Sequence, residues 1–213
     1  MGKLKSYLQK GRLEAGCDEA GRGCLAGPVF AAAVILPHGF RCPGLNDSKK
    51  VPPDEREEYR ILIEKNAIAW AVASIDSKVI DRINILRASI QAMHNALRSL
   101  TMRPEFIIVD GNRFYPFEDI DHECIIEGDG KFRSIAAASI LAKTHRDAHM
   151  RSLHEIYPQY GWNQNKGYAT EIHRTAILEH GVMHEHRMSF RFCNDPVQLD
   201  LFEETLEMQE EIS

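Results

Sequence analysis

The sequence predicts an α/β fold, in which helices cover a largely buried sheet. Phe106-Ile107-Ile108-Val109 is a short run that is apolar on both faces, which is typical of a central strand covered on both sides. From Val79 to Leu100, apolar residues recur every three or four positions, which indicates an amphipathic helix with one buried stripe. The 213 residues, 44% of them hydrophobic, suffice for one substantial core.

The remaining elements follow from turn residues and periodicity, taken in chain order. Pro53 suits the start of the first helix, and Asn84 is a point where the second helix could break. Strands are expected over Leu13–Cys17, Val29–Leu36, Ile68–Ile75, Phe106–Asp110 and Cys124–Glu127. Helices are expected from Pro53 to about Lys65, from Ser77 to a point before Pro104, from Ser134 through Lys143, and from about Thr170 to Gly181.

Two adjacent carboxylates, Asp18 and Glu19, close the first expected strand, and a Gly21-Arg22-Gly23 turn follows. Acids at a strand end can bend toward one cation, and a hard, oxygen-preferring ion such as Mg²⁺ or Mn²⁺ suits them. The two glycines let the backbone approach a ligand closely, and Arg22 offers a positive fork for phosphate. A bare acid pair in a turn is more often solvated, but the six residues together indicate phosphoryl chemistry.

Further acids follow later strands. Asp110 comes directly after the apolar run, and ligands of α/β sheets gather outside strand ends. Taken alone, Asp110 before Gly111 could instead be a turn residue. The next segment offers Glu127, which would continue a strand, and Asp129, in a Gly-Asp-Gly turn.

Several of these stretches resemble the ribonuclease HII (type 2 ribonuclease H) family. The resemblance runs in order from Leu13 to Phe190, with glutamate at position 127 where the family commonly has lysine. It rests on residues 18–23, Asn46-Asp47-Ser48-Lys49-Lys50, Gly128-Asp129, residues 134–143 with Arg146-Asp147, and Gly167-Tyr168-Ala169-Thr170 with His173. It implies a ribonuclease H-like fold, a mixed five-stranded sheet flanked by helices with a small helical C-terminal part.

The resemblance also implies a reaction and a set of site residues. The enzyme would cleave the RNA strand of RNA/DNA hybrids and the bond 5′ of ribonucleotides embedded in duplex DNA, leaving 3′-hydroxyl and 5′-phosphate. Two Mg²⁺ or Mn²⁺ ions would serve it. Asp147 competes for a metal role but ranks second, because an Arg–Asp pair on a helix is more often a surface pair. The catalytic and metal-binding set is Asp18, Glu19, Asp110 and Asp129, and the substrate-binding set is Gly21, Arg22, Gly23, Lys49, Lys143 and Tyr168, with Tyr168 stacking on a sugar at the RNA–DNA junction.

Two other functions stay open at this point. One is a metal-dependent DNA nuclease or phosphatase on the same scaffold, which would cut all-DNA substrates equally well. The other is a non-catalytic nucleic-acid-binding subunit, which the loss of an acid would favour, yet all four acids are present. The sequence contains no Ser-His-Asp set, Walker loop or dinucleotide fingerprint that would indicate covalent or cofactor chemistry.

Charge and composition divide the chain. The formal net charge is −5, but residues 196–213 contain six acids and neither Lys nor Arg. The rest is therefore close to neutral, which is compatible with a basic groove around an acidic metal site. We expect a catalytic core over residues 1–155, a small helical C-terminal subdomain over 156–195, and an acidic, mobile tail over 196–213.

The tail contains a possible partner-binding peptide. Gln198-Leu199-Asp200-Leu201-Phe202 resembles the Gln-Leu-x-Leu-Phe peptide by which many bacterial DNA-processing enzymes bind the sliding clamp. Gln198, Leu199, Leu201 and Phe202 would make the contacts. The alternative is a terminal helix that docks on the body through Leu199, Phe202 and Leu206.

The five cysteines are an odd number without a Cys-x-x-Cys pair. They predict reduced thiols in a cytoplasmic protein and disfavour a zinc site or a disulfide framework. The grouped residues His180, His184 and His186 are more often helix-end charge partners than metal ligands. No apolar run approaches the roughly 20 residues of a membrane helix. We expect a monomer that acts on nucleic acid away from membranes.

Overall fold

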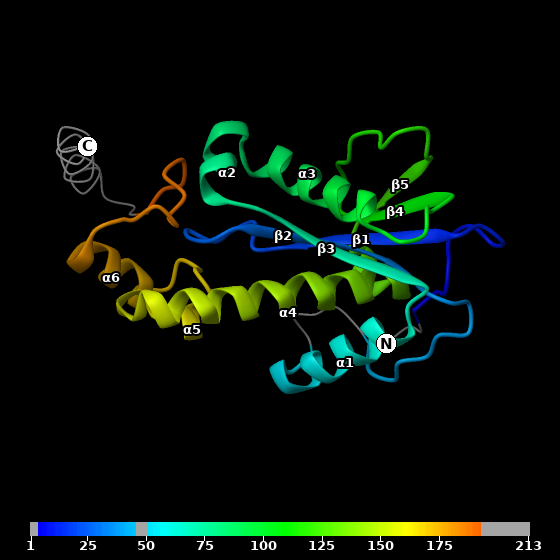
Figure 1. The fold of residues 1–213 in the computed structure, drawn as a ribbon, viewed down its shortest axis with the longest axis horizontal. Coiled ribbons are helices and arrows are strands. Elements are labelled where there is room, and N and C mark those ends of the chain that lie inside the picture. Colours follow the sequence, from blue (N-terminus) through cyan, green and yellow to red (C-terminus); the bar gives the residue numbers. More distant parts are fainter. Residues whose placement is uncertain (1–3, 46–50, 193–213) are drawn as a thin grey trace.

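The computed structural model describes residues 4–45 and 51–192, whose centre is a five-stranded sheet in the order β3-β2-β1-β4-β5 (Figure 1). Strands β1, β2 and β3 pair antiparallel, whereas β4 and β5 run parallel to β1. The mixed five-stranded sheet is therefore confirmed. The strands are β1 (Glu14–Ala20), β2 (Val29–Ile35), β3 (Ala69–Ile75), β4 (Phe106–Asp110) and β5 (His122–Ile125).

Helices cover both faces of the sheet (Figure 1). One face carries α2 (Ser77–Ile83) and α3 (Ile85–Arg98), and the other carries α1 (Pro53–Asn66) and α4 (Arg133–Ile156). The expected break at Asn84 is confirmed. Asn84 has a φ of 67° and its side chain accepts a hydrogen bond from the backbone N–H of Arg87, so it ends one helix and caps the next.

Small side chains bring α4 very close to the sheet. A Cβ at Gly16 of β1 would lie 2.3 Å from the carbonyl carbon of Ser134 in α4, a distance that no side chain tolerates. Ala136, Ala137 and Ala138 follow in the same helix and are fully buried. This close contact matters for the site, because it brings the first two turns of α4, which include Ser139, beside the acidic end of β1.

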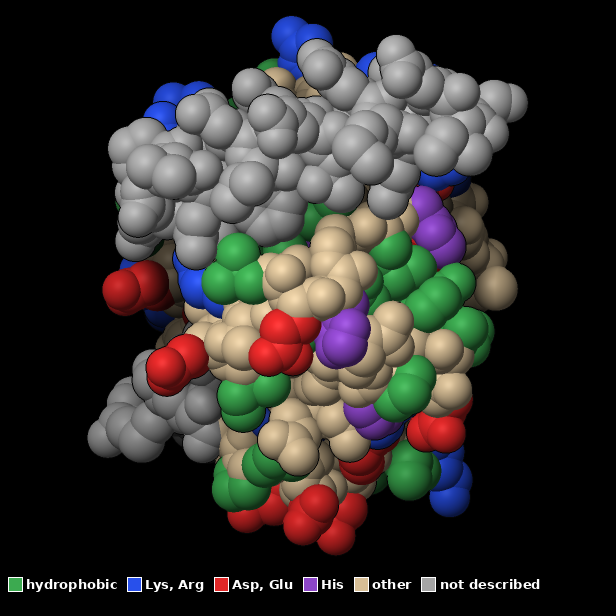
Figure 2. Space-filling view, turned by 90° about the vertical axis from the view of Figure 1, so that its left-hand side faces the viewer, with side chains coloured by type: hydrophobic (Ala, Val, Ile, Leu, Met, Phe, Trp, Pro, Cys, Tyr) green, Lys and Arg blue, Asp and Glu red, His purple; other side chains and the backbone are tan. Residues whose placement is uncertain are grey.

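A smaller cluster lies beyond the sheet, around the end of α4. It is built from the 3₁₀ turn Pro158–Tyr160, α5 (Trp162–Asn165) and α6 (Glu171–His180). Trp162 and Ile177 pack there against Met150 of α4 and against Leu25, which follows the Gly-Arg-Gly turn. The surface at this end mixes histidine, acidic and hydrophobic side chains (Figure 2). The C-terminal helices thus share their core with the loop that follows β1.

Two expected strands end elsewhere. Strand β1 does not stop at Cys17 but continues to Ala20, because β2 keeps pairing with it as far as Ala20 opposite Phe30. Conversely, Glu127 does not continue β5, since that strand ends at Ile125 and Glu127 adopts a left-handed φ of 53°. Lys49 and the peptide 198–202 lie outside the described residues.

Candidate active site

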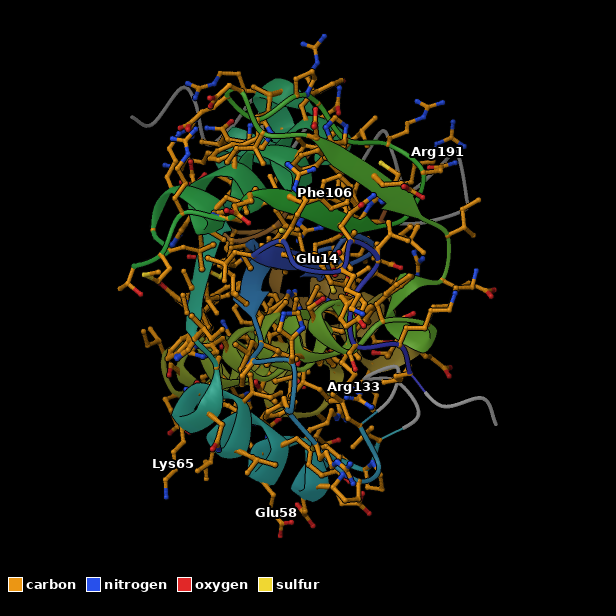
Figure 3. All side chains as sticks on the ribbon, turned by 90° about the vertical axis from the view of Figure 1, so that its right-hand side faces the viewer. Glu14, Glu58, Lys65, Phe106, Arg133 and Arg191 are labelled. Atoms are coloured by element: carbon orange, nitrogen blue, oxygen red, sulfur yellow. The ribbon has the colours of Figure 1, made fainter. Side chains whose placement is uncertain are left out.

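Asp18 and Asp110 meet where the parallel pairing of β1 with β4 ends. The last paired residues are Cys17 and Val109, so Asp18 and Asp110 follow at the same level of the sheet. The opposite ends of these strands begin with Glu14 and Phe106, which lie next to each other on the other side of the molecule (Figure 3). The parallel pairing therefore brings together two acids that are far apart in the sequence.

The side chains of Asp18 and Glu19 point to opposite faces of β1, as those of successive residues in a strand do. The Asp18 side chain accepts a hydrogen bond from the hydroxyl of Ser139 in α4. Glu19 pairs instead with Arg22, at 3.1 Å between Oε1 and Nη1. Both acids lie within β1 rather than in a turn after it, and the pleat rather than a bend sets their directions.

The carboxylates are close enough to affect one another's protonation. Asp18 is only 5% exposed, and burial raises its pKa well above the ordinary range for aspartate. The negative charges of Glu19 and Asp110 raise that pKa further. A positive charge placed among the three acids would relieve this repulsion.

Asp110 fixes the position of Asp129. Its Oδ1 atom accepts a hydrogen bond of 2.7 Å from the backbone N–H of Gly128. Gly128 opens the 3₁₀ turn Gly128–Gly130, which carries Asp129, and Asp129 accepts a hydrogen bond from the N–H of Gly130. Asp129 is therefore the neighbour in the chain of Gly128, which bonds directly to Asp110.

The donor chemistry of the four acids fits a hard divalent cation, because all the donors are carboxylate oxygens. Within residues 4–45 and 51–192, no three His, Cys, Asp or Glu side chains stand in positions that could hold a metal ion together. Glu19, turned toward Arg22, would have to rotate to join Asp18 and Asp110. The fit of these residues to a divalent cation therefore rests on the all-oxygen donor set and on the repulsion of Asp18 by Glu19 and Asp110.

The predicted substrate-binding residues gather beside these acids. Gly21 begins the turn with a φ of 93°. Just after the turn, Cys24 pairs across an isolated antiparallel bridge with Tyr168. The ring of Tyr168 is 39% exposed, and Lys143 Nζ lies 5.6 Å from its centroid. Gly21, Arg22, Gly23, Lys143 and Tyr168 therefore belong to one region.

Two buried arginines, which sequence reasoning missed, hold the loop after β1 in place. Arg146 and Arg187 are both fully buried, and their guanidinium groups donate to backbone carbonyl oxygens. The acceptors are Pro28, Ala26 and Lys166 for Arg146, and Gly27 and Arg22 for Arg187. The expected surface pair of Arg146 with Asp147 is therefore wrong. The carbonyls that need these donors face one another only in the folded chain, so neither the periodicity nor the motif that contains Arg146 indicated this role.

Asp147 has other partners. Its Oδ1 lies 2.7 Å from Lys143 Nζ and its Oδ2 lies 3.8 Å from Arg56. Asp147 also stands eight residues beyond Ser139 in α4, which corresponds to about 12 Å along a helix. These contacts support its second rank among the candidate metal ligands.

Two buried histidines, His173 and His186, lie next to the backbone of Tyr168. His186 Nδ1 accepts from the N–H of Met183 at 3.1 Å, and its Nε2 lies 3.3 Å from Nε2 of His173. His173 Nε2 accepts from the indole N–H of Trp162 at 3.0 Å, so its proton is on Nδ1 and points at the Tyr168 carbonyl oxygen, 2.9 Å away. Burial lowers the pKa of both histidines, to about 3 for His186. Of the grouped histidines, only His186 is buried.

The fold and the acidic site together define a ribonuclease H-like hydrolase. A family model described as Ribonuclease HII matches residues 15–193. The chain is 57% identical over 192 residues to Ribonuclease HII from Bacteroides thetaiotaomicron, which covers 90% of this chain and 96% of that protein. The chain belongs to the ribonuclease HII family and is a ribonuclease H that acts on RNA/DNA hybrids.

Solved structures share the fold. Ribonuclease H2 from Pyrococcus horikoshii OT3 matches with a TM-score of 0.72 at 24% identity, over 90% of this chain and 97% of that one. RNase HII from Archaeoglobus fulgidus, solved in a complex with PCNA, gives 0.68 at 24%, over 87% and 98%. Bst-RNase HIII, solved with Mn²⁺, gives 0.67 at 19%, over 90% and 70%.

Proposed function

We propose that this ribonuclease H also cleaves the phosphodiester 5′ of a ribonucleotide embedded in duplex DNA, leaving 3′-hydroxyl and 5′-phosphate. The observation that carries the proposal is that Asp18 and Asp110 lie level where the pairing of β1 with β4 ends, with Glu19 beside Asp18 in β1 and the Gly-Arg-Gly turn and Tyr168 next to them. The acids supply metal-binding charge, and the turn and the ring supply a surface that can read the sugar of one nucleotide.

Asp18, Glu19, Asp110 and Asp129 are proposed to hold two Mg²⁺ or Mn²⁺ ions. Such a pair activates the attacking water and stabilises the leaving 3′-oxygen. The Mn²⁺ bound in the related ribonuclease HIII supports this ion class. The chain's own contribution is to place the carboxylates, with Asp18 fixed by Ser139 and Asp110 by the N–H of Gly128.

Discrimination of RNA from DNA requires contact with the 2′-hydroxyl. The backbone of the Gly21-Arg22-Gly23 turn is proposed to make this contact, because no bulky side chain intervenes at either glycine. The carbonyl oxygen of Arg22 is occupied by the Arg187 guanidinium, which leaves the N–H groups of the turn as candidate partners. Tyr168, braced by His173, would stack on the neighbouring sugar.

A panel of duplexes tests the proposal. Duplexes that carry zero, one or four ribonucleotides are incubated with and without Mg²⁺, and the labelled products are sized and their ends identified. We expect Mg²⁺-dependent cleavage 5′ of the ribonucleotide and none of all-DNA duplex. Equal cleavage of all-DNA duplex would indicate a DNA nuclease, and binding without cleavage would indicate a non-catalytic subunit.

Asp110→Asn links this activity to the site. The amide keeps the shape but removes the charge, and such charge stabilisation is worth on the order of several kcal/mol, so nearly all cleavage should be lost while the protein stays folded. Asp121→Asn, on the exposed turn before β5, is the matched control and should cleave normally. Near-normal turnover of Asp110→Asn at saturating Mg²⁺ would reject the assignment.

The C-terminal peptide is proposed to bind the sliding clamp through Gln198, Leu199, Leu201 and Phe202. The PCNA complex of the Archaeoglobus protein supports a clamp as a partner of this family. Deletion of residues 196–213 should leave cleavage of short duplexes intact and abolish binding to the cognate clamp. Unfolding of the truncated protein, or no clamp binding by the intact one at high micromolar concentration, would refute this role.

A further inference from the structure

A cavity of about 160 Å³ opens beside the acids, between α3 and the end of β4. Glu19 and Asp110 line one side of it, and Leu86, Ile90 and Met93 of α3 line another. The helical stripe over residues 79–100 was expected to be core alone. Ile90 and Met93 are buried as expected, but together with Leu86 they also line a cavity next to the predicted catalytic residues.

Ser89 is the first sign that the cavity receives a ligand. Ser89 is 2% exposed and lines the cavity, and its hydroxyl oxygen has no hydrogen-bond partner within the described residues. An unsatisfied buried hydroxyl destabilises the folded protein. A helical hydroxyl usually bonds to a carbonyl one turn back, as Thr144 does with Ile140 in α4 at 2.7 Å. Ser89 makes no such bond.

The rim of the cavity supplies cationic and amide groups. Arg113 and Asn112 line it just after β4, and both residues are exposed. Across the described ranges, Arg113 forms no ion pair, whereas Arg103, near the other end of β4, pairs with Glu118 at 3.0 Å. A guanidinium that no carboxylate neutralises, next to an amide, is suited to bind a phosphate.

The dimensions and chemistry select one type of occupant. Pockets that enclose whole small molecules measure roughly 300–1,000 Å³, so this cavity has room for one part of a larger ligand. Its apolar wall suits the carbon face of a sugar, its hydroxyl suits a sugar oxygen, and its cationic rim suits a phosphate. A sugar–phosphate unit combines all three.

We propose that this cavity is a subsite for one sugar–phosphate unit of the cleaved strand, next to the scissile phosphate. The phosphate contacts Arg113 and Asn112, the sugar lies against Leu86, and Ser89 hydrogen-bonds a sugar oxygen. The subsite rests on the proposed function, because Glu19 and Asp110 belong both to the lining of this cavity and to the proposed catalytic set.

Uncharged methylphosphonate groups can show which phosphate of the cleaved strand Arg113 contacts. In a duplex with a single ribonucleotide, each phosphate of the cleaved strand within three positions of the cut is replaced in turn by methylphosphonate. KM is measured with Mg²⁺ and binding with Ca²⁺, for the parent, Arg113→Ala and the control Arg103→Ala. We expect Arg113→Ala to weaken binding about ten-fold, as for loss of one charge-assisted contact. At one position only, the methylphosphonate should weaken duplex binding by the parent but not by Arg113→Ala.

If the methylphosphonate and Arg113→Ala weaken binding additively at every position, the phosphate contact is overturned. An equal loss of binding in Arg103→Ala would overturn it as well. Ser89→Ala should raise KM a few-fold with no loss of thermal stability, since it removes an unpartnered hydroxyl. An unchanged KM would overturn the sugar contact. A parent that binds the duplex but does not cleave it would refute the proposed function alone, because the Ca²⁺ binding data still map the phosphate.

Discussion

Replacing His186 with Asn should remove part of the protein's sensitivity to acid. His186 is 1% exposed, and burial followed by the charge of His173 lowers its pKa to about 3. Unfolding returns it to the ordinary value of about 6.5. Between these two values the unfolded chain binds more protons, so stability is full near neutral pH and falls as pH falls.

The size of the effect follows from the shift. At pH 5 the folded His186 remains neutral while the unfolded one is mostly charged, which removes about 2 kcal/mol of unfolding free energy relative to pH 7. For a chain of this length, that corresponds to roughly 4–8 °C in Tm. The Asn variant loses some stability at every pH but lacks this titration. Its decline between pH 7 and pH 5 should therefore be smaller than that of the parent by about 2 kcal/mol.

Urea unfolding at pH 7, 6 and 5 measures the difference, with His180→Gln as the matched control because His180 is exposed. The raised pKa of Asp18 acts in the opposite direction, but it is common to all three proteins and cancels in the comparison. Parallel pH profiles for parent and His186→Asn would refute the reasoning.

Four further substitutions test the site. Asp129→Asn should abolish cleavage while Asp147→Asn has a milder effect, since a lysine already neutralises Asp147; single-turnover rates in the reverse order would show that the fourth acid is the wrong one. Tyr168→Ala should reduce cleavage at a lone ribonucleotide more than duplex binding, because stacking is worth roughly 1–3 kcal/mol; equal cleavage by mutant and parent would exclude it. Gly21→Ala should lower both Tm and activity, because its Cβ would lie 2.0 Å from Nε of the buried Arg146, a severe steric clash; a normal Tm would contradict that packing.

Local patterns predicted most of the elements. Runs of apolar residues located β2, β3 and β4 to within one residue. The helical spacing of apolar residues located α2 and α3, although α3 already ends at Arg98. The end of β1 was harder to predict. Asp18 and Glu19 are not strand-forming residues on their own, and only pairing with β2 extends the strand through them. The expectation that Glu127 continues β5 was wrong for the opposite reason. The hydrogen bond from the N–H of Gly128 to Asp110 bends the chain just after β5.

The sequence by itself determined the chemistry: an all-carboxylate acidic set, a glycine-rich turn beside it, and a tyrosine that can stack. Each of these is a property of residue type and of neighbours in the chain. The tertiary structure alone decided which acids meet, because the parallel register of β1 and β4 places Asp18 level with Asp110. It also decided that Arg146, Arg187, His173 and His186 are buried near the Gly-Arg-Gly turn and Tyr168. The carbonyl oxygens of Ala26, Gly27 and Arg22, which the two arginines bind, lie more than a hundred residues away in the chain and become their neighbours only when the protein folds.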